Sequence, residues 1–327
     1  MSTGNGEVFE IGIMARVTWN LHSLNNEGTV GNVIEPRTVV LASGQKTDGV
    51  SGEMLKHLHA QAVWLLEQDA GALCAACRKL DPRKAEENPE LKGVKEPAEA
   101  VGLAIRCALC DLHGFLRTAP PVSRNSTVEF GWALGLPERT YRSLHLHARH
   151  SLESRTKQER EEKPAQRGQA AEGEGAEGQE QPPTGQMLYH RPTRSGEYAV
   201  VSVFSPWRIG LNEVGYRYVI DEEARRHRYQ LALGAYRAMF MHTDGAMTST
   251  RLPHVEAMRG VVAVSGRQFP VPLLSPMAED YGDKLQRLQA QEPGLTVAGF
   301  DGLDQFCEVL NGLAERRPWV LDKAGVK

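Results

Sequence analysis

The sequence has few cysteines, few aromatic residues and no long hydrophobic run. Of its 327 residues, only 5 are cysteine and 6% are aromatic. A small disulfide-stapled domain is excluded, because such scaffolds are short and rich in cysteine. No apolar run approaches the ~18 residues that a membrane-spanning helix needs, and the chain does not open on the basic and then apolar segments of a secretory signal. We therefore expect a cytoplasmic protein whose cysteines stay reduced unless a metal holds them.

The acidic excess of the chain is small and comes from one segment. The formal net charge is −3, which argues against a uniformly basic nucleic-acid binder and leaves local patches open. Residues 151–186 hold eight acidic and five basic residues, so this segment alone accounts for that charge. It contains almost nothing to bury and cannot offset its ordering entropy. We expect a disordered acidic loop here.

Basic residues lie on both sides of this loop. Those before it are Arg139, Arg142, His145, His147, Arg149 and His150, and those after it are His190, Arg191 and Arg194. A loop with basic flanks is a reasonable nucleic-acid contact, and a solvated surface insertion is the alternative. The spacing of the three histidines before the loop also suits a metal, although a solvated or RNA-facing patch is more typical of a basic stretch.

Alternating hydrophobicity predicts strands, and a period of 3.6 residues predicts helices. Residues 9–19 alternate as a half-buried strand, and further strands are expected at 34–42, 198–204 and 260–264. Helices are expected at 51–68, 96–110, 222–240 and 303–316. Strands interrupted by helices at irregular intervals indicate an α+β fold with insertions.

The start of the first helix has the features of a phosphate site. Ser51 can cap the helix, and its apolar stripe consists of Leu55, Leu58, Ala62, Leu65 and Leu66. Glu53, Lys56 and His57 lie off that stripe, and a helix start that carries a lysine suits a phosphate. The preceding loop, residues 20–32, is rich in Asn, Gly and Ser. Such loops contact phosphate or sugar oxygens, and an ordinary turn-rich connection is the alternative.

Four of the five cysteines form two C-x-x-C pairs, Cys74 with Cys77 and Cys107 with Cys110. Each pair can place two thiolates on one tetrahedral metal, and two pairs complete a closed Cys₄ zinc site. A metal bound by both pairs would stabilise the charged spacer between them. The entropic cost of closing this loop rises only slowly with its length. We therefore predict a structural zinc at these four cysteines. Buried reduced cysteines are one alternative, and a redox dithiol is another.

No complete catalytic set is present. The sequence contains no Walker loop, dinucleotide-binding fingerprint, nucleophile elbow or H-E-x-x-H motif. Asp111 and His113 directly follow the second cysteine pair and can serve a metal or a general base, but a structural hydrogen bond is the commoner role of such a pair. We therefore expect a protein that is not an enzyme.

Several segments, in order along the chain, carry a resemblance to a known family. They are Arg16–Asn25, Ser51–His59, Asp111–Leu116, Gln186–Tyr189, Gly245–Ala246 and Arg251–Pro253. With these segments the chain resembles the backbone subunit of type I CRISPR Cascade complexes, the Cas seven superfamily, in its DevR and Csa-type branch. The resemblance covers most of the chain, apart from the cysteine spacer and the acidic loop.

The resemblance implies an α+β fold with an RRM-like (ferredoxin-like) palm, an inserted helical domain and a thumb. Residues 1–50 are expected to give the first palm strands and an RNA-facing loop. Residues 51–135 would form the helical insertion with the zinc site. The thumb, with its disordered loop at about 151–186, would occupy residues 136–197. The rest of the palm and the C-terminal helices would follow in residues 198–327.

The resemblance also implies a function. Members of this family polymerise head to tail along a CRISPR guide RNA in antiviral complexes and present the guide for pairing with target DNA, while a separate enzyme cuts. The implied partners are guide RNA, copies of the chain, other Cascade subunits and target DNA reached through the guide, without a membrane. The implied RNA-binding residues are Ser23, Asn25, Asn26, Ser51, Glu53, Lys56, His57, His147, Arg149, Gln186 and Met187. Asp111 and His113 match a family motif and are expected to be structural.

Two other functions stay open at this point. A related branch of the superfamily cuts RNA with an aspartate in its early loop, whereas residues 20–32 contain Glu27 and no aspartate. A metal-dependent ribonuclease would have to use Asp111 or Glu27 as its carboxylate. The DevR name suggests a transcriptional regulator, although no helix-turn-helix is evident in the sequence.

Overall fold

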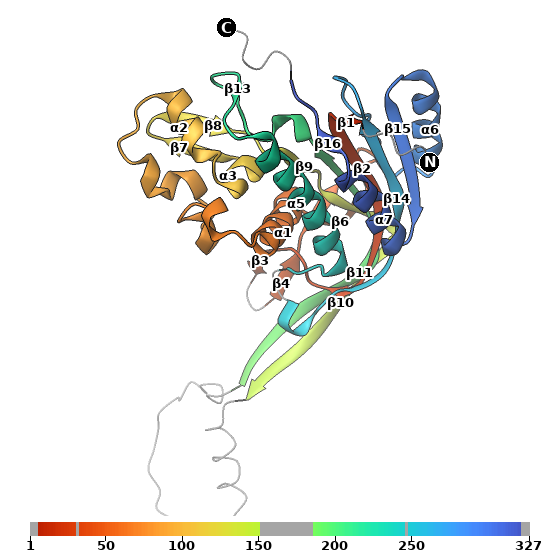
Figure 1. Cartoon of the computed structure of the whole chain (residues 1–327). Helices are drawn as coiled ribbons and strands as arrows, with labels where there is room; N and C mark the ends of the chain where they lie inside the picture. The colour runs from red at the N-terminus through yellow and green to blue at the C-terminus, as the bar shows by residue number, and fades with distance from the viewer. Residues whose placement is uncertain (1–5, 31–32, 151–185, 246–247, 322–327) are drawn as a thin grey trace, which may run out of the picture.

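The computed structural model describes residues 6–30, 33–150, 186–245 and 248–321. Its organising element is a ten-stranded, almost wholly antiparallel sheet, with helices packed against it (Figure 1). The main path through the sheet runs β15 (Leu295–Asp301), β14 (His254–Ser265), β2 (Glu10–His22), β11 (Gln186–Phe204), β10 (Ala133–His150), β6 (Lys46–Val50) and β5 (Thr38–Val40). Strands β3 (Asn26–Val30), β4 (Val33–Pro36) and β9 (Val128–Phe130) join off this path. The predicted α+β class is confirmed.

The central strand β2 is buried on both faces. Ile13 and its alternate neighbours join the main core, as the sequence pattern predicts. The opposite face was expected to be exposed, and this prediction is wrong. Met14 packs there against Val271, Tyr281 and Leu285, so residues that follow β14 cover the second face of the sheet.

The helices fill the space beside the sheet. They are α1 (Gly52–Leu66), α2 (Pro97–Ala104), α3 (Ala108–His113), α5 (Glu222–Met241), α6 (Tyr281–Gln291) and α7 (Leu303–Ala314). The predicted helix 96–110 is two helices, because the chain turns at residues 105–107. On α1, Leu65 and Leu66 are exposed, contrary to the predicted stripe, and His59 and Val63 are buried instead. Within the described ranges, no helix is long and apolar enough to cross a membrane.

The remaining elements are short. They are β1 (Glu7–Val8) with β16 (Arg317–Pro318), β7 (Phe115–Thr118) with β8 (Pro121–Arg124), β12 (Leu211–Asn212) with β13 (Arg217–Tyr218), and 3-10 turns at Ala70–Ala72, Cys77–Lys79, Lys84–Glu87, Pro89–Leu91, Pro206–Arg208 and Thr248–Thr250. The single strand predicted at 34–42 is wrong, since β4 and β5 are separate there.

Strands β10 and β11 form a long two-stranded ribbon that projects from the body (Figure 1). Their pairing runs from Thr140 opposite Gly196 out to His150 opposite Gln186. The ribbon therefore carries both basic flanks of the acidic segment. Residues 151–185, where the disordered loop was predicted, lie outside the described residues.

Candidate functional site

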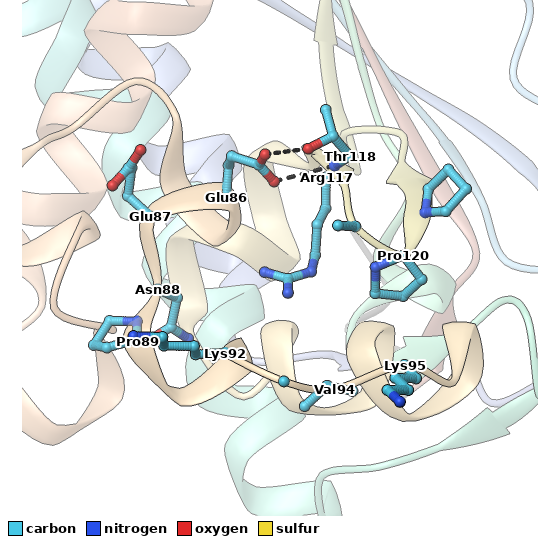
Figure 2. Close-up of a pocket in the computed structure, with 13 residues that line it drawn as sticks. Glu86, Glu87, Asn88, Pro89, Lys92, Val94, Lys95, Arg117, Thr118 and Pro120 are labelled. Carbon is cyan, nitrogen blue, oxygen red and sulfur yellow. Dashed lines mark hydrogen bonds between the residues drawn. The ribbon is translucent and has the colours of Figure 1, made fainter.

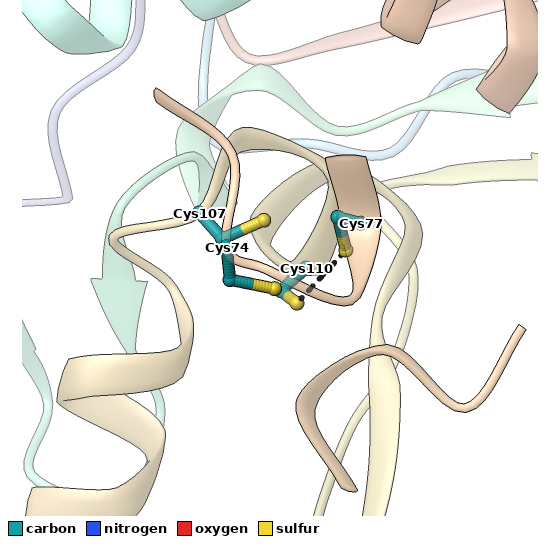
Figure 3. A group of neighbouring side chains, drawn as sticks. All are labelled: Cys74, Cys77, Cys107 and Cys110. Atoms are coloured by element: carbon teal, nitrogen blue, oxygen red, sulfur yellow. Dashed lines mark hydrogen bonds between the residues drawn. The ribbon is translucent and has the colours of Figure 1, made fainter. Parts of the chain in front are cut away.

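The four cysteines of the two C-x-x-C pairs meet in one buried cluster (Figure 3). Their sulfur atoms all lie within 4.8 Å of one another, and Cys77 Sγ is 3.6 Å from Cys110 Sγ. Hydrogen bonds from neighbouring thiols, first of all from Cys107 to Cys74 and from Cys110 to Cys107, lower the pKa of Cys74 and Cys107. Contacts with the same thiols, first of all Cys107, raise the pKa of Cys77 and Cys110. Four converging sulfurs can hold a soft or borderline metal ion.

Two local structures bring the cysteines together. The first pair spans a turn in which the Arg78 amide donates to the Cys74 carbonyl at 3.0 Å. The second pair begins α3, with Cys107 at its N-cap and Cys110 in its first turn. Cys307 lies on α7, outside the cluster. The spacing prediction for this cluster is therefore confirmed in its geometry.

The loop after β2 and the start of α1 form one hydrogen-bonded surface. The Asn25 side-chain oxygen accepts from the Ser51 amide at 2.9 Å, and Ser51 Oγ caps α1 by accepting from the Met54 amide at 3.2 Å. Ser23 Oγ and the Asn26 side chain are 3.3 Å apart. Residues far apart in the sequence, predicted to contact RNA, thus lie side by side.

Glu53, Lys56 and His57 lie in the next turns of α1, beside two adjoining hollows. The hollows have volumes of about 480 Å³ and 460 Å³, and both are lined by Glu53, Lys56, Lys84 and His113. Burial lowers the pKa of both lysines, and for Lys84 the nearby Lys56 ammonium lowers it further. Two ammonium groups therefore share one partly enclosed space.

The other predicted RNA-binding residues lie on the ribbon. His147 pairs with Tyr189, Arg149 with Met187, and Gln186 with His150 across the two strands. The structure describes the backbone of His147, Arg149, Gln186 and Met187 but not their side chains. The ribbon thus places these four residues near its outer end, away from the start of α1 (Figure 1).

Asp111 lies in a buried ion network. Its carboxylate accepts from Arg124 Nη2 at 2.6 Å, from Arg228 Nη1 at 2.7 Å and from the Gly210 amide at 2.9 Å. Asp111 is fully buried, and its charge is already compensated by two guanidinium groups. The other carboxylate considered for metal chemistry, Glu27, pairs with Arg37 at 2.7 Å. This arrangement matches the structural role expected for Asp111.

His113 is buried beside His59. The Ala232 carbonyl, 3.0 Å from His59 Nε2, can only accept, so Nε2 carries the proton and Nδ1 accepts from His113 Nε2 at 3.0 Å. His113 Nδ1 is then a hydrogen-bond acceptor, and it is buried with no hydrogen-bond partner among the residues that the structure describes. Burial lowers the pKa of His113, and lowers that of His59 to about 3.

These shifts predict an acid-sensitive fold. In the unfolded chain His59 binds a proton below a pKa of about 6.5, whereas in the folded chain it stays neutral down to about 3. The free energy of unfolding should therefore fall as the pH falls between these values, by about 1.4 kcal/mol per pH unit for this histidine. Urea unfolding at several pH values should show a slope smaller by that amount in His59→Gln. His254→Gln, at an exposed position, should keep the wild-type slope, and an unchanged slope in His59→Gln would contradict the prediction.

Sequence reasoning missed two cations of this region. Lys84 is one of many charged residues in the cysteine spacer, and nothing in its neighbours marks it out. Arg194 is fully buried and donates to the Asn25 carbonyl at 2.6 Å, and its Nε and Nη1 find no hydrogen-bond partner in the described part of the chain. Its only sequence signal was its place in the basic stretch after the acidic segment.

Another hollow, with a volume of about 790 Å³, lies elsewhere, between residues 86 and 121 (Figure 2). Arg117, Lys92 and Lys95 line it, but so does Glu86, whose carboxylate accepts from the amide and the hydroxyl of Thr118. These two hydrogen bonds lower the pKa of Glu86, and the Arg117 charge lowers it further. Residues of both charges therefore line this hollow, and none of the predicted RNA-binding residues lies in it.

Comparison with solved structures places the fold among known ones. A chain of a "CRISPR RNA-guided surveillance complex" is similar with a TM-score of 0.50 at 12% identity, covering 93% of this chain and 98% of that chain. A chain of a "CRISPR RNA-guided surveillance complex, pre-nicking" gives a TM-score of 0.49 at 14% identity, with 87% and 88% covered. No curated protein shows significant sequence similarity.

The family comparison covers most of the chain. Residues 13–286 match the family described as "CRISPR-associated negative auto-regulator DevR/Csa2". The match includes most of β2, the loop after it, α1, the cysteine cluster and the β10–β11 ribbon. The chain therefore belongs to the DevR/Csa2 family of CRISPR-associated proteins.

Proposed function

We propose that this protein is a non-catalytic backbone subunit of a Cascade-type complex, which binds CRISPR guide RNA, polymerises along it and presents it to target DNA. Membership of the DevR/Csa2 family supports the link to CRISPR. The structural likeness to a chain of an RNA-guided surveillance complex supports the fold that this role needs. We further propose that the sheet forms an RRM-like palm, that other Cascade subunits are partners, and that the complex is cytoplasmic.

One observation carries the RNA-binding part of the proposal. The Asn25–Ser51 hydrogen bond joins an amide-rich loop to the N-terminus of a 15-residue helix that carries Lys56. Helix N-termini and lysines attract phosphate groups, and amide side chains bond to phosphate and sugar oxygens. This surface recognises a sugar–phosphate backbone without reading bases, as a subunit repeated along any guide requires.

The absence of catalysis is proposed from the two candidate carboxylates. The oxygens of Asp111 bond to two arginines and a backbone amide, and Glu27 bonds to Arg37. A nuclease metal would have to displace these partners. We propose on this basis that the protein does not cut RNA.

We also propose that the cysteine cluster holds a structural zinc. Tetrahedral zinc with Zn–S bonds of about 2.3 Å places its sulfur ligands about 3.8 Å apart. The 3.6 Å between Cys77 and Cys110 is close to this spacing. Because protein sulfurs would fill all four positions, the metal would stabilise the fold rather than activate water.

The proposed function predicts RNA-dependent assembly. Coexpression with a CRISPR array should give several copies of the chain on one repeat–spacer RNA, seen by native mass spectrometry with sequencing of the bound RNA. Lys56→Glu should weaken RNA binding roughly tenfold or more, because it removes a phosphate contact and adds repulsion. Lys92→Glu, at an exposed position of the insertion, should not change it.

Other outcomes would contradict this function. A monomer that carries no RNA would exclude the backbone role. Bound fragments cut at regular intervals would indicate the ribonuclease. The family description names a negative auto-regulator, so tight binding to one duplex DNA sequence in place of RNA would indicate a transcriptional regulator.

A further inference from the structure

The hollow beside the start of α1 is completed by a residue from the cysteine-bearing insertion. Lys56 comes from α1, whereas Lys84 comes from a 3-10 turn between the two cysteine pairs. Lys84 Nζ donates to the carbonyls of His113 at 3.1 Å and Gly114 at 3.0 Å. An ammonium group has three protons to donate, so one remains for a ligand in the hollow.

The cysteine cluster positions both the backbone and the side chain of Lys84. On one side, short turns lead from Cys77 to Lys84, through the Leu80 amide bonded to the Cys77 carbonyl at 3.0 Å and the Lys84 amide bonded to the Asp81 carbonyl at 3.1 Å. On the other side, the His113 carbonyl accepts a hydrogen bond from the Lys84 ammonium. His113 is the last residue of α3, the helix that contains Cys110. Bringing the cysteines together therefore brings Lys84 to the end of α3, in the hollow that Lys56 also lines.

The charges of this hollow indicate the ligand. Among the described residues no carboxylate forms an ion pair with Lys56 or Lys84, and burial and then the nearby Lys56 charge lower the pKa of Lys84. Glu53 and Glu129 also line the hollow, and carboxylates can only accept hydrogen bonds. A doubly charged free phosphate would be repelled by them, whereas a singly charged phosphodiester with a hydroxyl on its sugar satisfies lysines and carboxylates together.

We propose that Lys84 and Lys56 together bind one phosphodiester of single-stranded RNA in this hollow, with its ribose hydroxyl toward Glu53. Lys84 is thus a further RNA-binding residue, supplied by the insertion. This inference rests on the proposed function, since it specifies how that surface holds the guide.

The test compares two matched lysine variants of the full-length protein. Fluorescence anisotropy would follow binding of a labelled single-stranded repeat–spacer RNA across a range of salt concentrations. Lys84→Gln keeps donors for the two carbonyls and removes the charge, so it should bind about tenfold more weakly, with a salt slope lower by about 0.7. Lys92→Gln, in the mixed-charge hollow of the same insertion, should bind as the wild type does, and Lys84→Arg should recover most of the affinity. DNA of the same sequence should bind more weakly than RNA, and inorganic phosphate should not compete.

The outcomes separate this inference from the function on which it rests. If the wild type does not bind RNA at all, the proposed function fails. If it binds and Lys84→Gln equals Lys92→Gln in affinity and salt slope, Lys84 does not contact the backbone and the inference is overturned. Competition by inorganic phosphate, or equal affinity for DNA, would overturn the ribose–phosphodiester assignment. A thermal melt of each variant shows whether a loss of binding reflects a loss of folding.

Discussion

Replacing Asp111 with alanine is expected to lower the free energy of unfolding by about 3–5 kcal/mol, a large share of the stability of an ordinary domain. The carboxylate joins α3 to β8 through Arg124 and to α5 through Arg228. Both arginines are themselves buried. Without the carboxylate, Arg228 would stay in a poorly solvated interior without the counter-charge it has now, and Arg124 would keep only the Glu213 carboxylate, 3.9 Å away. That penalty exceeds the loss of the hydrogen bonds themselves.

Urea unfolding followed by circular dichroism would measure this effect. Asp111→Asn keeps the shape of the side chain and removes only its charge, so it separates the ion pair from packing. Asp301→Asn, at an exposed position, should stay within about 0.5 kcal/mol of the wild type. Combining Asp111→Asn with Arg228→Met should cost less than the sum of the two single changes, because the second removes one stranded charge. An unfolding midpoint for Asp111→Ala equal to that of the wild type would show that the network contributes no stability.

The parts of the fold that were predicted correctly depend on short-range patterns. Strand β2 and helix α1 follow from alternation, periodicity and the Ser51 cap, all of which act within a few residues. The second face of β2 was wrongly expected to be exposed, because the residues that cover it, near Val271 and Leu285, are far away in the sequence. Helix α6 was not predicted, because it buries only Tyr281 and Leu285 and its apolar pattern is therefore sparse.

The candidate site, like the fold, has features that short-range patterns predict and features that depend on long-range contacts. C-x-x-C spacing carries its own geometry, and the predicted cysteine cluster forms. Lys84 becomes a candidate RNA-binding residue only because it lines the same hollow as Lys56 and His113. The folded chain brings these three residues together, although they are far apart in the sequence. Similarly, a carboxylate held by Arg124 and Arg228 cannot be told from a metal ligand until the fold shows which cations surround it. Pairings across long stretches of chain are not recorded in local sequence patterns.

Removing the metal that we propose for the cysteine cluster is expected to lower the thermal unfolding midpoint by about 10 °C or more. Metal-binding energy becomes folding energy when the unfolded chain offers no preformed site. The first part of the spacer between the cysteine pairs, residues 78–96 before α2, consists mainly of short 3-10 turns, and its buried apolar side chains are Ala85 and Leu91. Few other contacts in this segment can replace the bound metal, so removing the metal should lower the stability of the fold strongly.

Elemental analysis should find one zinc per chain, and a strong chelator should lower the melting temperature. Cys110→Ser should lose the metal and melt at a temperature that chelator no longer changes, whereas Cys307→Ser, a buried cysteine outside the cluster, should keep both the metal and the response. A wild-type protein without metal, whose melting chelator does not affect, would show instead a cluster of buried reduced thiols. Because the cluster also holds Lys84 beside Lys56, metal-stripped protein that is still folded should bind RNA no better than Lys84→Gln does. That comparison would show that the metal acts on the guide through this lysine as well as through the stability of the fold.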